Sequence, residues 1–490
     1  MKQKPIYEAV EIFRQHGILV SSDISERDVG KISYNSKDVD SSTLFVCKGI
    51  NFRDVYLKEA VEGGAFCYVS EKEYEGINCD SIIVTDIRLA LAYLAKWYYE
   101  YEGTSPKLIG VTGTKGKSTV TYFIKNILTQ GGIRCGYITT IDTFDGKETK
   151  ESVLTTPESL ELYELLYNAR NNGCEYMVVE VSSQAEKMHR IEGLEFEAGV
   201  FVNISDDHIS PNEHHSFEEY LDFKGKIVSR FKNAVINIDD EHSEDIISYA
   251  KEKNHKVITY SVRNSSADYY AGDVTKDGFR SIFKVHSPVN EFDAVVEIPG
   301  EFNVANSLAA SAIADIVGVD SDSVTEAILK TRVNGRMNIF RSGKYIAIVD
   351  YAHNKHSLDA ALTALKEYYP DRNIILAFGC PGEKALQRRH DMAEVASKYA
   401  KYVYVTSEDP GRVDPMVIAE EVKGYLDGFG TDCEIITDRK EAVITAVEKL
   451  TEDDILIIAG KGSEHYQVVG SVAQPYESDT ELAEKYIMLK

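Results

Sequence analysis

The chain has 490 residues, a length at which we expect several domains, because single domains usually hold roughly 100–200 residues. Hydrophobic residues make up 43% of the sequence and charged residues 27%, which is ordinary for a globular protein and excludes a disordered, collagen-like or coiled-coil chain. The 54 Lys and Arg residues against 79 Asp and Glu residues give a net charge of −25, which argues against a nucleic-acid partner.

The spacing of the cysteines and the length of the apolar runs indicate in which cellular compartment the protein resides. Seven cysteines are spread along the chain without a CxxC pair, so we expect reduced thiols and neither a disulfide framework nor a zinc site. No apolar run reaches the roughly 18–20 residues that span a bilayer, and the first residues lack the apolar core of a signal peptide. We therefore expect a cytoplasmic protein with no membrane partner.

The first hundred residues predict a small α/β domain, 1–104. Short apolar runs at 43–47 and 65–69 predict strands, and the helical spacing of apolar residues at 89–98 predicts a helix. The loop-like sequence Gly103-Thr-Ser-Pro106 predicts the end of the domain.

The segment 105–334 predicts a central nucleotide-binding domain. Apolar strands alternate there with helical stretches, the order that produces a mostly parallel sheet covered by helices. The strands are expected at LIGVTG (108–113), YMVVEVSS (176–183), AGVFVNIS (198–205) and AVINI (234–238).

A second series of strands and helices at 335–490 predicts a Rossmann-like C-terminal domain. Its strands are expected at YIAIVDYA (345–352), NIILAFG (373–379), YVYVTSE (402–408) and DILIIAG (454–460), with helices at 357–368 and 389–399. The predicted fold class is therefore α/β with three domains: a smaller N-terminal α/β domain, a central P-loop domain with a parallel sheet, and the Rossmann-like domain.

A glycine-rich loop follows the first strand of the central domain. It consists of Gly113, Thr114, Lys115, Gly116, Lys117, Ser118 and Thr119. Glycines let backbone N–H groups converge on phosphate oxygens, and the N-terminus of the following helix adds partial positive charge. Lys117 would contact the β- and γ-phosphates, and the Ser118 hydroxyl would ligate Mg²⁺. We predict a site for ATP or GTP, although Val111 stands where the strict P-loop pattern has its first glycine and an ordinary surface turn is the alternative.

Three further polar residues follow in order. Glu180 ends an apolar strand, where a metal-binding acid faces a bound phosphate. His208 follows a second such strand, and Lys224 follows a helical stretch. Each one alone is more often a solvated rim residue, but their common order after the glycine-rich loop indicates one site.

These blocks resemble those of the Mur ligase family. Gly113–Thr119 is similar to the family's G-T-x-G-K-[ST]-[ST] loop, and similar blocks follow at Glu180-Val-Ser-Ser183, Asp207-His208, Tyr220-x3-Lys224, Gly300–Asn306, Gly335-Arg336-Met337, Asp350–Asn354, Phe378–Gly382 and Gly460–Gln467. Tyr34–Lys37, Thr43–Gly49 and Thr155–Glu158 resemble the MurE subfamily. The resemblance covers nearly the whole chain, and it implies a monomeric enzyme that adds the third amino acid to UDP-N-acetylmuramoyl-L-alanyl-D-glutamate.

The resemblance implies an ATP-dependent amide ligase in which the D-Glu side-chain carboxylate first becomes an acyl phosphate and then reacts with an amine. Catalysis would need Lys117 and Mg²⁺, because two anions must be brought together. One Mg²⁺ would be held by Ser118 and Glu180, and a second by His208 and a carbamylated Lys224.

The resemblance also implies contacts with the substrate and with ATP. Ser36, Thr155, Thr156, Ser182 and Arg190 match the block that binds the UDP-sugar dipeptide. Asn303 and Asn306 match positions near adenine, and Arg336 and Asp350 match positions near the phosphates and ribose; without the resemblance, an Asn before a helical run is more often an N-cap.

The incoming amino acid is open between L-lysine and meso-diaminopimelate. Diaminopimelate-adding members show D-N-P-R, whereas this chain has Glu408-Asp409-Pro410-Gly411-Arg412. An acidic loop without Arg at the fourth position favours a distal ammonium, hence L-lysine, although Arg412 is able to replace the missing carboxylate contact. Arg389 matches the residue that holds the α-carboxylate, and Gly460 and Glu464 belong to a block that meets the amine, in which Ser463 replaces the family's His.

Two other functions are weighed against this one. A folylpolyglutamate synthase shares the ATP and metal blocks but lacks the N-terminal and Thr155–Glu158 blocks. A P-loop NTPase switch without a covalent product would not need Glu180, His208 and Lys224 together.

Overall fold

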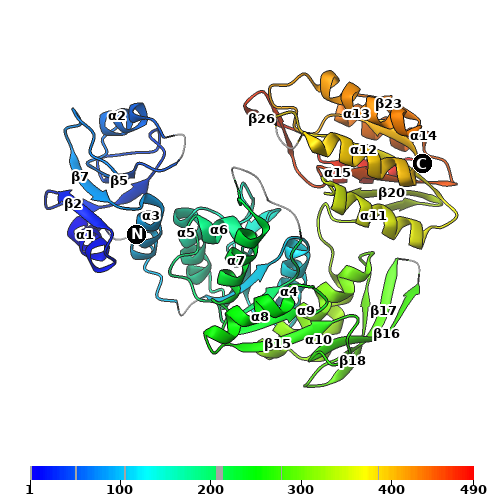
Figure 1. Cartoon of the computed structure of the whole chain (residues 1–490), viewed down its shortest axis with the longest axis horizontal. Coiled ribbons are helices and arrows are strands. Elements are labelled where there is room, and N and C mark those ends of the chain that lie inside the picture. Colours follow the sequence, from blue (N-terminus) through cyan, green and yellow to red (C-terminus); the bar gives the residue numbers. More distant parts are fainter. Residues whose placement is uncertain (1–2, 50–51, 104–105, 206–212, 278, 384–385) are drawn as a thin grey trace. The chain divides into compact units, whose positions relative to one another are not determined.

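The computed structural model describes residues 3–49, 52–103, 106–205, 213–277, 279–383 and 386–490, and its elements are labelled in Figure 1. The chain forms two compact units, one of residues 1–269 with 309–320 and the other of residues 270–308 with 321–490. Each unit is a mixed α/β structure, so the α/β fold class predicted from the sequence is confirmed.

The N-terminal part of the first unit is built on a five-stranded sheet. Its strand order is β2-β7-β6-β5-β4, and every neighbouring pair is parallel except β2 with β7. The strands are β2 (Leu19–Asp23), β4 (Lys31–Ser33), β5 (Thr43–Val46), β6 (Cys67–Ser70) and β7 (Asp80–Val84), with helices α1 (Ile6–Gln15), α2 (Asp54–Glu62) and α3 (Ile87–Tyr98). The short strands β1 (Lys4–Pro5) and β3 (Asp28–Val29) pair beside it.

The rest of the first unit is built on a sheet with the order β11-β10-β9-β12-β8-β13-β14-β15. Its strands are β8 (Lys107–Thr112), β9 (Cys135–Ile138), β10 (Asp142–Phe144), β11 (Thr149–Glu151), β12 (Tyr176–Glu180), β13 (Ala198–Phe201), β14 (Asn233–Asn237) and β15 (Lys256–Ser261). The helices are α4 (Lys117–Gln130), α5 (Ser159–Asn171), α6 (Ser183–Lys187), α7 (Phe217–Val228) and α8 (Ser243–Glu252). Strands β9, β12, β8, β13, β14 and β15 are parallel to one another, and β10 pairs antiparallel with β9. Strand β8 lies between β12 and β13, where the strand order reverses. Ligands bind at such a point, beyond the carboxyl ends of the strands.

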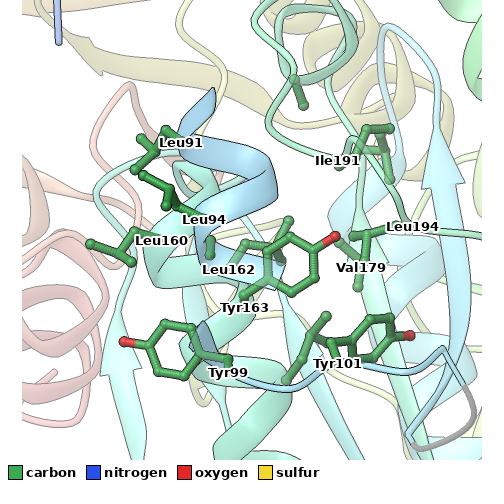
Figure 2. Close-up of a cluster of buried hydrophobic side chains, with 14 of the residues drawn as sticks. Leu91, Leu94, Tyr99, Tyr101, Leu160, Leu162, Tyr163, Val179, Ile191 and Leu194 are labelled. Atoms are coloured by element: carbon green, nitrogen blue, oxygen red, sulfur yellow. The ribbon is translucent and has the colours of Figure 1, made fainter. Parts of the chain in front are cut away.

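A continuous core joins the two sheets of the first unit, because α3 packs against α5 (Figure 2). Leu91 and Leu94 of α3 and Leu162 and Tyr163 of α5 are at most 1% exposed. Each such side chain contributes roughly 1.5–3 kcal/mol by leaving water. Trp97 on the half-buried side of α3 donates its indole N–H to Glu8 Oε2 at 2.8 Å and so ties α3 to α1.

The second unit contains a meander and a six-stranded sheet. The antiparallel meander consists of β16 (Tyr269–Asp277), β17 (Arg280–His286) and β18 (Glu291–Val296), against which α10 (Ser321–Lys330) packs. Helix α9 (Glu301–Val317) is divided between the units.

The six-stranded sheet has the order β19-β20-β24-β21-β22-β23 and is parallel except for β19. Its strands are β19 (Asn338–Ser342), β20 (Tyr345–Asp350), β21 (Asn373–Phe378), β22 (Ala400–Val405), β23 (Cys433–Ile435) and β24 (Asp454–Ala459), and a hairpin of β25 (Tyr466–Val469) and β26 (Val472–Pro475) follows. The helices are α11 (Lys355–Tyr368), α12 (Gln387–Tyr399), α13 (Pro415–Phe429), α14 (Arg439–Lys449) and α15 (Asp479–Ile487).

The strands expected from apolar runs are present, with ends shifted by a few residues; for example, the run 108–113 forms β8, Lys107–Thr112. The domain limits 1–104, 105–334 and 335–490 stay a prediction. Among the described residues, no helix has both the length and the apolar character needed to cross a bilayer.

Candidate active site

The glycine-rich loop runs from the carboxyl end of β8 into α4, as the sequence predicts. A side chain at Gly113 would bring its Cβ within 2.9 Å of Val202 Cβ, and Gly116 adopts a left-handed φ of +84° at the N-cap of α4. Asn203 fixes the loop, because its Oδ1 accepts from the backbone N–H of Thr114 at 3.1 Å and of Lys115 at 2.9 Å. Both positions therefore require glycine for the shape of the loop itself, whether or not a ligand binds.

Lys117 lies over this loop at the first turn of α4. Its Nζ donates to the carbonyl oxygens of Gly113 at 3.0 Å and Thr114 at 3.1 Å. Ser118 and Thr119 follow it and are buried. An ammonium group beside the N-terminus of a fourteen-residue helix is suited to phosphate oxygens.

Glu180 ends β12, the strand next to β8, and its side chain is fully buried. One carboxylate oxygen accepts from the Thr140 backbone N–H at 3.2 Å, and the other accepts from the Thr140 hydroxyl at 3.1 Å. Burial raises the pKa of Glu180, while Lys117 and a hydrogen bond from Ser118 offset part of this rise. A carboxylate, a hydroxyl and an ammonium thus meet at the point where the strand order reverses.

Lys224 lies on α7 and is 1% exposed, with its Nζ 4.7 Å from the centre of the Tyr220 ring. The Tyr220 hydroxyl is 3.0 Å from the Thr114 hydroxyl, so this helix contacts the glycine-rich loop. His208 lies outside the described residues.

Four of the five residues expected to bind the UDP-sugar dipeptide lie close to Glu180. The Thr156 hydroxyl donates to the Glu180 carbonyl at 2.8 Å, and Thr155 accepts from the Thr140 hydroxyl at 3.1 Å. The Ser182 N–H donates to the Thr156 hydroxyl at 3.0 Å, and Arg190 donates to the Thr156 carbonyl at 3.1 Å.

The fifth residue, Ser36, lies in the loop after β4 and donates to Glu59 Oε2 at 2.8 Å. Among the described residues, no hydrogen bond joins Ser36 to the other four.

The positions expected near the base and ribose of ATP lie in the second unit. Asn303 and Asn306 are 2% exposed and bonded to each other, with Asn306 Nδ2 donating to Asn303 Oδ1 at 3.0 Å. Asp350 is buried, and its Oδ2 accepts from the Met337 N–H at 2.8 Å. Burial raises the pKa of Asp350, and the neighbouring Arg336 offsets part of this rise.

Acidic residues gather beyond the carboxyl ends of β22 and β24 in the second unit. We call Glu408, Asp409 and Glu464, together with Lys461 between them, the acidic pocket. Lys461 Nζ lies 3.0 Å from Asp409 Oδ1 and forms a second ion pair with Glu464. Glu408 is 7% exposed, and its Oε2 has no hydrogen-bond partner among the described residues.

Glu408 is the electrostatically unusual member of the acidic pocket. Burial raises its pKa to about 7, although Arg388 and Arg439 favour the charged form. A Cβ on Gly460 would lie 3.3 Å from Glu408 Oε2, so this predicted site residue adjoins the carboxylate. A cation placed beside Oε2 would stabilise the charged form of this buried acid.

The two arginines expected to meet the amino acid are bonded to the protein itself. Arg389 is 5% exposed, forms an ion pair with Glu421, and donates to the Gly382 carbonyl at 2.8 Å. Arg412 donates through Nη2 to the Ser471 hydroxyl at 3.1 Å. Their assigned roles stay predictions.

Sequence reasoning did not single out Lys461, nor the fully buried ion pair of Arg439 with Asp479. Arg439 also donates to the carbonyls of Ser407 at 3.0 Å and Ala459 at 2.8 Å, the residues just before Glu408 and Gly460. A lone Arg at the start of α14 carries no signal of this network, because its three partners are at least 20 positions away in the sequence.

Comparison with known proteins agrees with the geometry. Residues 111–314 match the protein family described as "Mur ligase middle domain", and residues 335–462 match the family described as "Mur ligase, glutamate ligase domain". A UDP-N-acetylmuramoyl-L-alanyl-D-glutamate–L-lysine ligase of Enterococcus faecalis is 37% identical over 96% of this chain and 94% of its own. The chain belongs to the Mur ligase family. It is therefore an ATP-dependent ligase that forms an amide bond.

Two further matches fit this family. A ligase of the same name from Streptococcus thermophilus is 35% identical over 93% of this chain and 92% of its own. A solved structure of a UDP-N-acetylmuramoyl-L-alanyl-D-glutamate–2,6-diaminopimelate ligase has a TM-score of 0.67 at 27% identity and covers 97% of this chain and 98% of its own. The resemblance predicted from the motifs is confirmed.

Proposed function

We propose that this Mur ligase joins L-lysine to UDP-N-acetylmuramoyl-L-alanyl-D-glutamate. Two relatives that match more than nine-tenths of the chain carry the name of this activity. The structural observation that carries the choice of lysine is the buried carboxylate of Glu408 in the acidic pocket, whose Oε2 has no hydrogen-bond partner among the described residues. These matches favour a muramoyl-peptide ligase over a folylpolyglutamate synthase or an NTPase switch.

The reaction has two steps. An oxygen of the D-Glu side-chain carboxylate attacks the γ-phosphorus of ATP, which forms an acyl phosphate and releases ADP. The lysine α-amine, in its neutral form, then attacks the acyl carbon, phosphate leaves, and the nitrogen loses a proton as the amide forms. Lys117 neutralises charge on the transferred phosphoryl group, and the backbone N–H groups at the start of α4 hold the phosphates in place.

The residues around Glu180 fit a bound Mg²⁺. Ser118 and Glu180 offer a hydroxyl and a carboxylate, which are oxygen ligands that Mg²⁺ prefers. Burial raises the pKa of Glu180, and Lys117 offsets this rise only in part, so a further cation would favour the charged carboxylate. Mg²⁺ held there would reduce the repulsion between the two anions that react. Lys224, carbamylated, and His208 would hold a second ion.

The acidic pocket favours a distal ammonium over a distal carboxylate. When all three are ionised, Glu408, Asp409 and Glu464 carry three negative charges, while Lys461 and Arg388 supply two positive ones. The ammonium of lysine completes the balance, whereas the extra carboxylate of meso-diaminopimelate would lie against the same acids.

The backbone at Gly411 also disfavours the arginine that diaminopimelate-adding members carry. Gly411 has a φ of +59°, and a Cβ there would lie 2.5 Å from Glu383 Oε2. A carboxylate contact from Arg412 would require its release from Ser471.

The proposal is tested by ADP release from ATP, Mg²⁺ and the UDP-dipeptide with each amino acid in turn. We expect ADP and a lysine-containing product with L-lysine, at least tenfold faster at low concentration than with meso-diaminopimelate. A preference for meso-diaminopimelate would contradict the lysine assignment and would indicate that Arg412 leaves Ser471. Absence of ADP release with any amino acid would contradict the proposed function itself.

A further inference from the structure

Three cationic side chains converge on one carboxylate in the first unit. We call Lys48, Arg88, Arg190 and Glu158 the cation cluster. Lys48 Nζ lies 2.8 Å and Arg88 Nη1 lies 3.6 Å from Glu158 Oε2, and Arg190 Nη2 lies 3.0 Å from Glu158 Oε1. Three positive charges therefore share one negative charge, in a protein whose net charge is −25.

The cluster is partly withdrawn from water. The side chains of Lys48, Arg190 and Glu158 are 9%, 14% and 15% exposed, and that of Arg88 is 28% exposed. Burial lowers the pKa of Lys48, which Glu158 partly offsets. Burial alone would raise the pKa of Glu158, yet Arg190, Lys48 and Arg88 hold it below its usual value. Glu158 thus keeps together cations that would otherwise repel one another.

Part of the donor capacity of the cluster is unused. Arg88 Nη1 and Arg190 Nε are buried and make no hydrogen bond with any described residue. The second nearby acid, Glu161, accepts a hydrogen bond from Tyr34, whose ring lies 4.0 Å from Lys48 Nζ. Unused donors beside a surplus of positive charge suit an anion, and a guanidinium binds phosphate or carboxylate groups well.

The cluster adjoins the candidate active site. Arg190 Nη1 donates to the carbonyl of Thr156 at 3.1 Å, and the Thr156 hydroxyl donates to the carbonyl of Glu180 at 2.8 Å. Lys48 comes from the end of β5 and Arg88 from the first turn of α3, so the N-terminal sheet supplies two of the three cations.

We propose that Lys48 and Arg88 extend the substrate site by binding an anionic group of the UDP-muramoyl dipeptide together with Arg190. This inference rests on the proposed function and adds two binding residues to it. The anionic group is the diphosphate of the nucleotide or a carboxylate of the dipeptide. Glu158 acts as the organising counter-ion, and the substrate contributes the negative charge that the cluster lacks.

The opposing view is that the cluster only fastens the N-terminal sheet to the sheet of β8 and β12. In that case neutralising Lys48 or Arg88 lowers thermal stability but leaves substrate affinity unchanged once the protein is folded.

The test is calorimetric binding of the UDP-dipeptide, and separately of UDP, to the full-length protein without ATP. We expect Lys48→Met and Arg88→Gln to weaken the affinity for the UDP-dipeptide at least tenfold, and Lys48→Arg to recover most of it. Lys31→Met is the matched control, because Lys31 pairs with Asp38 on the surface of the same sheet. If the variants also lose affinity for UDP, the anionic group that the cation cluster binds is the diphosphate. If their affinity for UDP is unchanged, the group is a carboxylate of the dipeptide.

The kinetic readout separates binding from folding. We expect the KM for the UDP-dipeptide to rise in Arg88→Gln, the more exposed of the two positions, while the KM values for ATP and lysine stay within twofold of the unaltered enzyme. Folded variants that bind the UDP-dipeptide as tightly as the unaltered protein would overturn the inference. An unaltered protein that does not bind the UDP-dipeptide would overturn the proposed function as well.

Discussion

The loop around Lys117 and the acidic pocket around Glu408 both lie beyond the carboxyl ends of parallel strands, but they are built in different ways. The loop is defined by the backbone: two glycines, a left-handed N-cap, and an Asn203 side chain that bonds main-chain N–H groups. The acidic pocket is defined by side chains: three acids and one lysine, with Glu408 Oε2 left without a hydrogen-bond partner among the described residues.

The difference predicts how the two sites respond to substitution. A site made of backbone groups binds phosphate whatever the third substrate is, and it changes little when one surface side chain changes. A site made of a charge balance changes its preference when a single charge is added or removed. We therefore expect the loss of Lys117 to lower turnover with any amino acid, and substitutions in the acidic pocket to alter selectivity and pH dependence.

The largest effect is expected for Lys117→Ala. Loss of the Lys117 ammonium removes a preorganised contact with the transferred phosphoryl group, which usually lowers kcat by about 10²–10³. ADP release measures this effect, and Lys150→Ala on the exposed strand β11 is the control. Turnover close to that of the unaltered enzyme in a folded Lys117→Ala protein would contradict the role of the loop.

The next effect concerns Lys224. If it is carbamylated, Lys224→Ala removes an anion from the site, so activity falls to near zero and a small carboxylate such as acetate restores part of it. ¹³C-labelled bicarbonate would also give a carbamate signal in the unaltered enzyme that the variant lacks. An active enzyme with neither the signal nor rescue would show that Lys224 acts as a plain ammonium.

The acidic pocket depends on the buried pair of Arg439 and Asp479. Arg439→Met leaves Asp479 without its partner at zero exposure, and we expect a loss of about 3–5 kcal/mol in the free energy of unfolding. Scanning calorimetry measures the loss, and the double variant Arg439→Met with Asp479→Leu should recover much of it. Lys344→Met, which breaks a pair on the surface, should show no measurable change.

The raised pKa of Glu408, about 7 in the folded protein, gives a pH dependence of stability. Between pH 4.5 and 7 the folded state keeps a proton that the unfolded state loses, so stability falls as pH rises through this window. The total is about 3 kcal/mol, complete above pH 7. The Glu408→Gln variant should lack this fall. The variant should therefore be more stable than the unaltered protein at pH 8 and equally stable near pH 4. Parallel stability curves would show that Glu408 ionises normally.

The smallest effect is the selectivity for lysine. Glu408→Gln removes one charge from the acidic pocket, and we expect the KM for L-lysine to rise about tenfold, which corresponds to about 1.4 kcal/mol, while the KM for ATP stays unchanged. Glu420→Gln on α13, outside the acidic pocket, is the control. An unchanged KM for lysine would mean that the distal ammonium is bound elsewhere.

The sequence predicts the strands and the loop well, because apolar runs and glycines reflect local requirements. The run 108–113 with Gly113 and Gly116 leads directly to β8 and α4. Asp409 is also recognisable as part of an acidic loop. Its pairing with Lys461 is not, because the two residues are 52 positions apart and meet only when β22 and β24 lie in one sheet.

The cation cluster shows the same limit. Arg190 is predicted from its block. Lys48 lies in the Thr43–Gly49 block but has no role predicted from it, and Arg88 lies in no block. They reach Glu158 only because α3 packs against α5, an arrangement that depends on tertiary packing of leucines and tyrosines (Figure 2).

Trp97, the single tryptophan among 490 residues, lies on α3, the helix that joins the two sheets of the first unit. Excitation at the red edge of the spectrum, where the thirty tyrosines do not absorb, therefore reports on this helix alone. The protein thus carries a built-in fluorescent probe whose emission follows the N-terminal sheet when ligands are titrated, without any label.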